Sequence, residues 1–205
     1  KTSAIAESLT LHASFDSSLD ADFARGDRTC YVQDGKELHH AAANADAVLV
    51  PDSGRFGGSL HFPKKSGYRP TFRDAGVLGY SDTHWNTTVS VWDDGNKGFI
   101  FLEFSKDETP RYFRYAIRPL VHIWNPDGVT WAEIPFDKRP MVQVERPPFS
   151  REAWTHVVFT LENVNDKSKP QFGRLYMNGE RQGSIQNWDL TFGWDPAQVL
   201  LVLGA

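Results

Sequence analysis

Apolar and polar residues alternate at every second position in several short runs of this chain, from Leu9 near one end to Leu203 near the other. In a β-strand successive side chains point to opposite faces, so a run of this kind has one apolar face and one polar face. The run at residues 9–15 places leucine, alanine and phenylalanine on one face and threonine, histidine and serine on the other. The pattern therefore predicts strands that each bury one face against a core.

A turn signal and an alanine-rich segment add to this pattern. Asn178-Gly179 separates two short runs, and both residues tolerate the positive φ angles of a tight turn, so residues 174–185 predict a β-hairpin. Residues 37–48 are compatible with a helix, which would be too short to set the fold class. Other strands are predicted at residues 58–62, 87–92, 98–104, 113–118, 154–161 and 199–203. Strands without alternating helices predict an all-β fold, an antiparallel β-sandwich of the jelly-roll type.

Length, charge and cysteine content exclude several kinds of protein. The chain has 205 residues, a length that suits one domain with a sizeable core. Its formal net charge of -4 argues against a nucleic-acid partner, because binding to phosphates requires a positive field. The sequence contains no apolar run long enough to span a bilayer, so we expect no membrane insertion. Cys30 is the only cysteine, which excludes an internal disulfide.

Several segments resemble a known family when they are read in order: LTLHASFDSSLDADFARGD, GRFGGSLHF, TTVSVW, WTHVVFTLEN, GRLYMNGERQGS and LLVLGA. Their order and spacing resemble those of laminin-G-like domains of the concanavalin-A-like lectin/glucanase superfamily, over nearly the whole chain. The likeness is greatest to versions found in exported proteins of bacteria such as planctomycetes. The resemblance implies that residues 1–205 form a single laminin-G-like β-sandwich in a secreted, periplasmic or cell-surface protein.

The chain departs from the family pattern at two places. The resemblance implies additional residues between Trp92 and Asp93, and a closing C-terminal strand after Ala205. The resemblance implies that this closing strand completes the inner sheet, so a chain without it would leave an unpaired sheet edge, which natural sheets avoid. We therefore expect the natural polypeptide to contain both segments.

Asp16, Asp20 and Asp22, followed by Asp27, lie close together in the sequence just after the first predicted strand. Calcium takes about six to eight oxygen ligands, many of them from carboxylates. The resemblance implies one structural calcium ion near here, completed by an acidic residue of the closing strand. The alternative interpretation is that these residues are solvated loop acids.

The segment from Arg111 to Trp131 is rich in aromatic and basic residues and includes Arg114, Arg118 and Trp124. Aromatic faces stack on the apolar faces of sugar rings, and arginine binds carboxylate or sulfate through paired hydrogen bonds. These five residues therefore predict a surface that binds a polysaccharide, with a preference for acidic glycans. In the alternative interpretation the aromatic residues belong to the core and the arginines to the solvated face. Three other tryptophans in loop-like contexts are further candidates: Trp85, Trp188 and Trp194.

Groups suited to catalysis are sparse. Glucanases of this superfamily carry a Glu-x-Asp-x-Glu strand whose carboxylates face one glycosidic bond, whereas the nearest strand here offers Glu103 alone. Cys30 has no flanking catalytic motif, and no serine lies in a Gly-x-Ser-x-Gly turn. His39 and His40 are adjacent and point apart, which is unfavourable for binding one metal ion together. The sequence therefore predicts no enzymatic activity.

These observations favour a non-catalytic carbohydrate-binding or adhesion module of an exported or cell-surface protein. The first alternative is a structural or protein-interaction domain of a larger surface protein, which would contact other domains of the same polypeptide. The resemblance is compatible with both functions, because one fold can serve glycan and protein ligands alike. The second alternative is a glycoside hydrolase or polysaccharide lyase.

Overall fold

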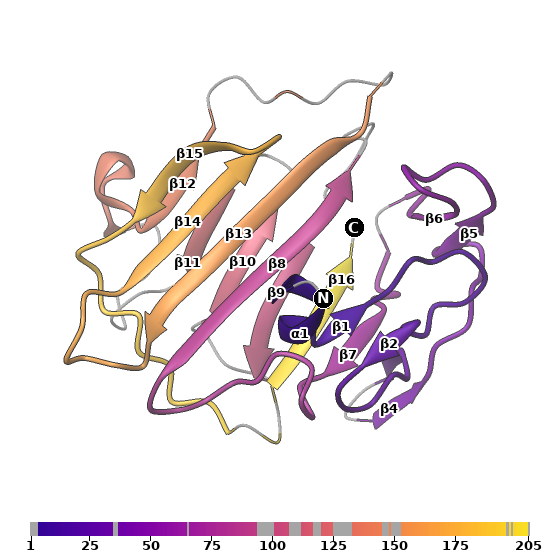
Figure 1. Cartoon of the computed structure of the whole chain (residues 1–205), viewed down its shortest axis with the longest axis horizontal. Coiled ribbons are helices and arrows are strands. Elements are labelled where there is room, and N and C mark those ends of the chain that lie inside the picture. The colour runs from indigo at the N-terminus through magenta and orange to yellow at the C-terminus, as the bar shows by residue number, and fades with distance from the viewer. Residues whose placement is uncertain are drawn as a thin grey trace.

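The protein is an antiparallel β-sandwich, in which one sheet lies in front of the other in Figure 1. The computed structural model describes residues 4–34, 37–64, 66–93, 101–106, 112–116, 120–124, 133–144, 148, 153–195, 197 and 199–204. Within these residues the front sheet has the strand order β15-β14-β13-β8, and the rear sheet has the order β12-β11-β10-β9-β16-β7-β3-β4. Two smaller pairs, β1-β2 and β5-β6, lie beside the sandwich.

The elements are short, apart from β8 and β13. The strands are β1 (Leu11–His12), β2 (Phe23–Ala24), β3 (Tyr31–Asp34), β4 (Glu37–His40), β5 (Val48–Val50), β6 (Ser59–His61), β7 (Thr71–Arg73), β8 (Trp85–Asp93), β9 (Phe101–Lys106), β10 (Tyr112–Ala116), β11 (Leu120–Trp124), β12 (Met141–Gln143), β13 (Thr155–Val164), β14 (Phe172–Met177), β15 (Glu180–Ile185) and β16 (Val199–Gly204). The helical elements are α1 (Ala4–Ser8) and a 3-10 turn at Phe136–Lys138. Neither of these, nor any other helix in the described part of the chain, has the length and apolar character needed to cross a membrane.

The core lies between the two sheets and is built from the inward rows of their strands. On β13 every second residue is buried, so that Val157, Phe159 and Leu161 are almost completely shielded from water. Truncating a buried phenylalanine to alanine typically costs about 3–5 kcal/mol, so the row on β13 is a major source of stability. Residues of both sheets and of the connecting loops complete this core: Phe72, Trp85, Leu175, Met177, Ile185, Leu190, Phe192, Trp194, Val199 and Leu201.

The predicted hairpin is confirmed. β14 and β15 pair antiparallel, and Met177 faces Glu180 across the turn. Asn178 and Gly179 have φ angles of 49° and 83°, which is the left-handed backbone that a tight two-residue turn requires. The two turn residues therefore fix the register between β14 and β15 next to the turn.

Residues 37–48, whose sequence is compatible with a helix, do not form one. Residues Glu37–His40 form β4, which pairs with β3, and Val48 begins β5. Between these strands the side chain of Asn44 accepts hydrogen bonds from the backbone N–H groups of Asp46 and Ala47, at 2.8 and 3.2 Å. Intrinsic helix propensity differs by less than about 1 kcal/mol per residue even for alanine, the strongest helix former, so pairing with β3 and this asparagine turn outweigh the local preference.

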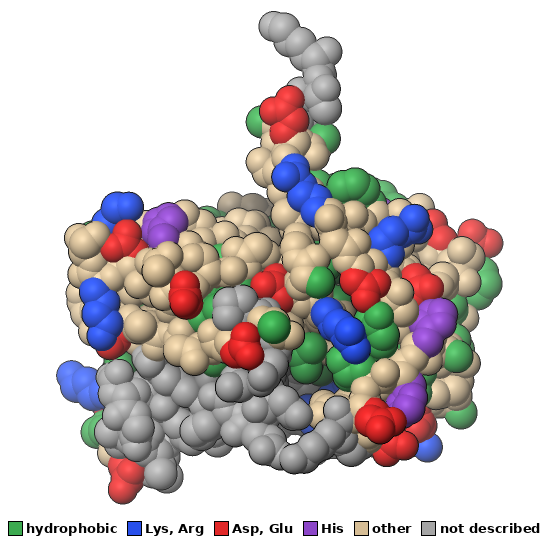
Figure 2. Space-filling model, turned by 90° about the horizontal axis from the view of Figure 1, so that it is seen from below, with side chains coloured by type: hydrophobic (Ala, Val, Ile, Leu, Met, Phe, Trp, Pro, Cys, Tyr) green, Lys and Arg blue, Asp and Glu red, His purple; other side chains and the backbone are tan. Residues whose placement is uncertain are grey.

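The last strand of the chain has a neighbour on each side. β16 lies inside the rear sheet, with β9 on one side and β7 on the other. The closing strand after Ala205 stays a prediction, but the pairing of β16 does not require it. At the other end of the chain, α1 projects from the body of the domain (Figure 2), and the Arg25 side chain donates to the backbone carbonyl of Leu9 at its base.

Cys30 lies in the core, with its side chain completely buried. Burial raises the pKa of the Cys30 thiol to about 12. We therefore expect the folded protein at pH 8 to react with a thiol reagent on the order of a thousandfold more slowly than the urea-unfolded chain, whose cysteine has a pKa of about 8.5. Rapid labelling under native conditions would show that the cysteine is accessible and contradict this placement.

Candidate functional site

The outward row of β8 carries the most exposed aromatic side chain of the front sheet. Residues of β8 alternate in burial along the whole strand, so the side chains of Thr88, Ser90 and Trp92 point to solvent while their neighbours face the core. Trp92 lies directly opposite His156 of the neighbouring strand β13. A tryptophan and a histidine therefore lie side by side on the solvent face of the sheet.

Two ring contacts, one of them supported by a hydrogen bond, hold the Trp92 ring in place. The Trp92 and His156 rings are stacked, with centroids 4.7 Å apart and an angle of 12° between their planes. A hydrogen bond of 2.8 Å joins His156 Nε2 to Ser90 Oγ and orients the imidazole. On another side, Phe56 from the β5–β6 loop meets Trp92 edge to face, with centroids 5.5 Å apart. Aromatic pairs of this geometry contribute about 0.5–1.5 kcal/mol beyond the area they bury.

The loop that carries Phe56 is anchored to the N-terminal segment of the chain. Gly58 N–H donates to Asp16 Oδ1 at 2.6 Å, and Gly54 N–H donates to the carbonyl of Gly57 at 2.7 Å. A Cβ atom on Gly57 would lie 2.4 Å from Asp16 Oδ1, so only glycine permits this approach. The hydrogen bond to Asp16 thus fixes the position of a loop forty-two residues away in the sequence.

Arg55 adds a positive charge above these rings. Its guanidinium carbon lies 5.1 Å from the centroid of Phe56 and 5.5 Å from that of Trp92. Both distances are within the range of cation–π attraction. No carboxylate in the described part of the chain forms an ion pair with Arg55, so the guanidinium remains available to a ligand. We refer to Arg55, Phe56, Trp92 and His156 as the aromatic–arginine cluster.

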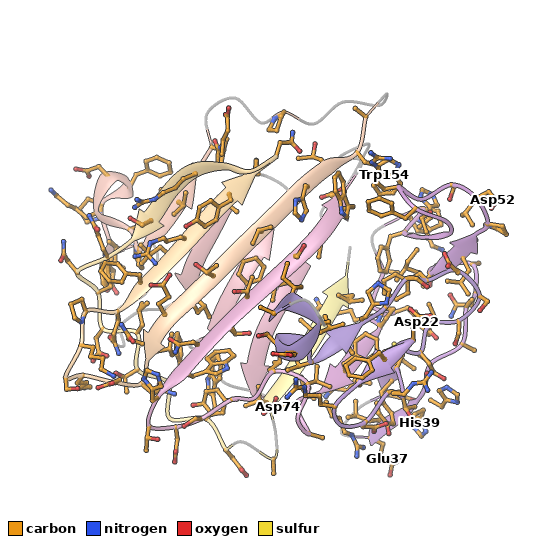
Figure 3. All side chains as sticks on the ribbon, in the orientation of Figure 1. Asp22, Glu37, His39, Asp52, Asp74 and Trp154 are labelled. Carbon is orange, nitrogen blue, oxygen red and sulfur yellow. The ribbon has the colours of Figure 1, made fainter. Side chains whose placement is uncertain are left out.

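The aromatic–arginine cluster lies at one end of a groove with a volume of about 360 Å³. Arg55, Trp92 and Trp154 all line this groove. Figure 3 shows Trp154 at the end of β8, beside the β5–β6 segment. The cluster therefore combines exposed aromatic rings, an arginine with no ion pair among the described residues and an adjacent concave surface.

Most of the sequence-predicted ligand residues cannot be compared with this cluster. Arg111, Arg118 and Trp131 lie outside the described residues. Arg114 lies in β10, where its backbone pairs with Glu103 and His122, and its side chain is not described. Trp124 is the last residue of β11 rather than part of a loop, and its side chain is likewise not described. The predicted surface at residues 111–131 stays a prediction.

The three aspartates predicted to bind calcium have separate protein partners. Asp20 accepts hydrogen bonds from Cys30 N–H at 2.8 Å and lies 3.1 Å from His40 Nε2. Asp22 accepts a hydrogen bond of 2.6 Å from Ser14 N–H, and its pKa is lowered because this bond and His12 outweigh the effect of burial. In the part of the chain that the structure describes, no group of three or more metal-binding side chains lies close enough to hold an ion. Calcium binding stays a prediction.

Two of the further tryptophan candidates belong to the core. Trp85 and Trp194 are 1% and 4% exposed, and the Trp85 indole N–H donates to the carbonyl of Leu78 at 3.0 Å. These side chains are therefore unavailable to a ligand in the folded protein. Sequence reasoning missed Trp92 and Phe56, although the outward position of Trp92 opposite Val89 and Val91 is readable from the alternation in TTVSVW.

Comparisons with known proteins agree with the fold. No family model matches the chain, and no curated protein matches it. Among solved structures, domain 4 of AbnA, a GH43 extracellular arabinanase from Geobacillus stearothermophilus solved in complex with arabinotriose, is similar at 16% identity and a TM-score of 0.53, covering 96% of this chain and 92% of that one. The binding domain of Paraclostridial Mosquitocidal Protein 1 is similar at 11% identity and a TM-score of 0.44, covering 86% of this chain and 47% of that one. The chain thus spans about half the length of the mosquitocidal binding domain. The likeness to domain 4 of AbnA supports the β-sandwich fold.

Substituting Asp16 tests its role as an anchor of the β5–β6 loop. Asp16→Ala should destabilise the protein by about 1 kcal/mol, because it removes the acceptor for Gly58 N–H. Asp16→Asn should be milder, since an amide oxygen still accepts that hydrogen bond. Urea denaturation of both variants measures the difference, and an alanine variant as stable as the original protein would contradict the anchoring role.

The same variants separate anchoring from calcium binding. If Asp16 is a calcium ligand, a chelator should lower the Tm of the original protein, because a bound ion stabilises the folded state. Asp16→Asn should then abolish this response. Anchoring alone predicts equal melting curves with excess calcium and with chelator.

Proposed function

We propose that this protein is a non-catalytic carbohydrate-binding module of an exported or cell-surface protein, and that it binds glycans on the aromatic–arginine cluster. One observation carries the proposal: two rings in mutual contact are presented to solvent, with Phe56 79% exposed and Trp92 37% exposed. Apolar surface is ordinarily removed from water, so a preorganised exposed aromatic pair indicates a binding surface. The apolar faces of sugar rings fit such a pair.

The fold and the sequence support the same proposal. Laminin-G-like domains, which the sequence resembles, and the arabinanase domain solved with arabinotriose are both β-sandwiches. The arabinanase domain has a comparable length, and its ligand makes arabinose oligosaccharides reasonable first probes. A β-sandwich also supplies a rigid support, since His156 and Trp92 lie on paired strands that are held by the core.

The acidic residues along the groove support a non-catalytic role. Asp93 is the only carboxylate among the described residues that line the groove, and it lies on the buried side of β8. Hydrolysis of a glycosidic bond ordinarily requires a pair of carboxylates placed on either side of that bond. The groove thus offers surface for binding without the acid–base pair.

Arg55 gives the proposed surface a preference for acidic glycans. A guanidinium above two aromatic rings can bind a uronate carboxylate or a sulfate while the sugar ring stacks below it. The net charge of the chain is -4, so this preference would arise from the local arrangement and not from the overall field. Acidic glycans were also expected from Arg111, Arg114 and Arg118, whose surface stays a second proposal.

Removing either exposed ring should weaken glycan binding. For Trp92→Ala and for Phe56→Ala we expect roughly a fivefold or larger loss of affinity, which corresponds to about 1 kcal/mol per aromatic contact. Phe56→Ala should lower Tm by no more than a few degrees, because most of its side chain is already in water and the edge-to-face contact with Trp92 contributes only about 1 kcal/mol. Isothermal titration with oligosaccharides selected by a glycan screen, beginning with arabinotriose, measures the effect.

Phe136→Ala provides a matched control for the ring variants. Phe136 is also exposed, at 59%, and also has an arginine near its ring, with Arg139 5.6 Å from the centroid, but it does not line the groove. An equal loss of affinity in this control would contradict a specific surface at Trp92. Failure of the original protein to bind any glycan in the screen would overturn the proposed function itself.

The charge preference has a separate test. Arg55→Gln should lower affinity for oligogalacturonate by about two- to fivefold, the size expected for an exposed ion pair, and should leave a neutral oligosaccharide unaffected. Added salt should reduce the difference between the original protein and the variant, because exposed charges are screened. Arg139→Gln is the matched control, and Trp124→Ala in the same assay tests the second proposed surface.

A further inference from the structure

A second hollow, with a volume of about 340 Å³, lies at the other end of the front sheet. It is lined mainly by the segment between β13 and β14 and by the segment that follows β15. In Figure 1 the chain leaves β13 at the lower left of the front sheet, whereas β8 ends at the upper right. β13 has ten residues, so at about 3.3 Å per residue its two ends are roughly 30 Å apart. The hollow is therefore separate from the aromatic–arginine cluster and its groove, with which it shares no lining residue.

Trp188 and Phe172 give this hollow an aromatic surface. Trp188 is the remaining tryptophan of the three that the sequence placed in loop-like contexts, and unlike the other two it is only half-buried. It packs against the hydrophobic core while it also lines the hollow. A ring that is held by the core and retains accessible surface offers a rigid platform for the apolar face of a sugar ring.

An ion pair joins the two segments that line the hollow. Lys167 Nζ lies 3.1 Å from Asp189 Oδ2, and both residues line the hollow. Their side chains stay accessible to water, with exposed fractions of 69% and 40%. Lys169 also lines the hollow, and its ammonium group lies 3.1 Å from Asp166 Oδ2. The hollow therefore presents hydrogen-bond donors beside a hydrogen-bond acceptor, with both positive charges balanced by carboxylates.

Hydrogen bonds fix these segments before any ligand arrives. Gln171 Oε1 accepts a hydrogen bond of 2.8 Å from Leu190 N–H, and Asn163 Nδ2 donates to the carbonyl of Pro170 at 2.8 Å. Gln171 Nε2 is buried at the wall of the hollow and donates to no atom in the described part of the chain. A buried donor of this kind is unfavourable unless an acceptor reaches it, and a hydroxyl oxygen of a ligand would be such an acceptor.

A neutral sugar unit fits this set of groups best. Two neighbouring hydroxyls can bind the Lys167–Asp189 pair together, one accepting from the ammonium group and the other donating to the carboxylate. The same sugar unit offers an apolar face to Trp188. An anionic ligand is disfavoured, because Asp189 repels it and both lysines already have carboxylate partners. A purely apolar ligand is disfavoured as well, because it would remove polar groups from water without replacing their hydrogen bonds.

We propose that this hollow is a second glycan-binding site, which takes a neutral sugar unit stacked on Trp188 with neighbouring hydroxyls bound to Lys167 and Asp189. The site rests on the proposed function only for the class of ligand, since none of its residues belongs to the aromatic–arginine cluster. It differs from that cluster in chemistry, because Arg55 favours acidic glycans there. Two sites roughly 30 Å apart would hold one polysaccharide at two points and raise the affinity above that of either site alone.

The test follows the indole N–H signals of Trp188 and Trp92 by NMR, assigned from their loss in Trp188→Phe and Trp92→Phe. The probes are the neutral trisaccharides arabinotriose, xylotriose, cellotriose and mannotriose, and the acidic trigalacturonate. We expect at least one neutral probe to shift the Trp188 signal, and the shift to persist in Trp92→Ala. No shift at Trp188 with any neutral probe, or a shift that Trp92→Ala abolishes, would overturn the second site. A shift at Trp188 with none at Trp92 for any probe would instead contradict the proposed function of the cluster.

A matched pair of variants locates the binding without disturbing the packing of Trp188. Lys167 and Lys138 are both exposed and both lie near an aspartate, at 3.1 and 3.8 Å, but Lys138 does not line the hollow. Lys167→Met should weaken the binding reported by the Trp188 signal by about two- to tenfold, the size expected for one lost hydrogen bond. Lys138→Met should leave it unchanged. Equal effects of the two variants, or no effect of Lys167→Met, would overturn the proposed site.

Discussion

The burial of one face of β13 against the rear sheet determines what the rest of the front sheet presents to solvent. Val157, Phe159 and Leu161 are almost fully buried, so the intervening residues of the strand must point outward. β8 is paired to β13 residue by residue, so its inward-facing and outward-facing positions lie opposite those of β13 that face the same way. Trp92 and His156 are consequently outward neighbours, and a shift of the register by one residue would move both rings into the core.

Contacts between segments that are distant in the sequence complete the surface. Phe56 and Arg55 reach Trp92 only because the β5–β6 loop is held against Asp16 by the hydrogen bond from Gly58. The glycine at position 57 is needed for the same close approach. An aspartate that composition alone associates with calcium has here a demonstrable role in positioning a loop. The cation and one of the two exposed rings depend on that anchor.

The edge strands of the two sheets differ in how they are covered. β16 is protected on both sides by β9 and β7, whereas β8 has one described partner and an apolar groove on its other side. The exposed rings lie on the outward face of β8, and the groove follows the unpaired edge of the same strand.

The sequence by itself determined the sandwich class, the Asn178-Gly179 hairpin and the approximate positions of the long strands, because period-two alternation and turn residues act locally. Local helix preference did not decide the structure of residues 37–48, because strand pairing with β3 outweighs the helix propensity of the alanines there. Tertiary structure alone decided that Trp85 and Trp194 are core, that β16 is central, and that Arg55 and Phe56 lie over Trp92. The physical reason is that which strand pairs with which, and which loop packs on which strand, depend on contacts between residues far apart in the chain, and no local pattern encodes them.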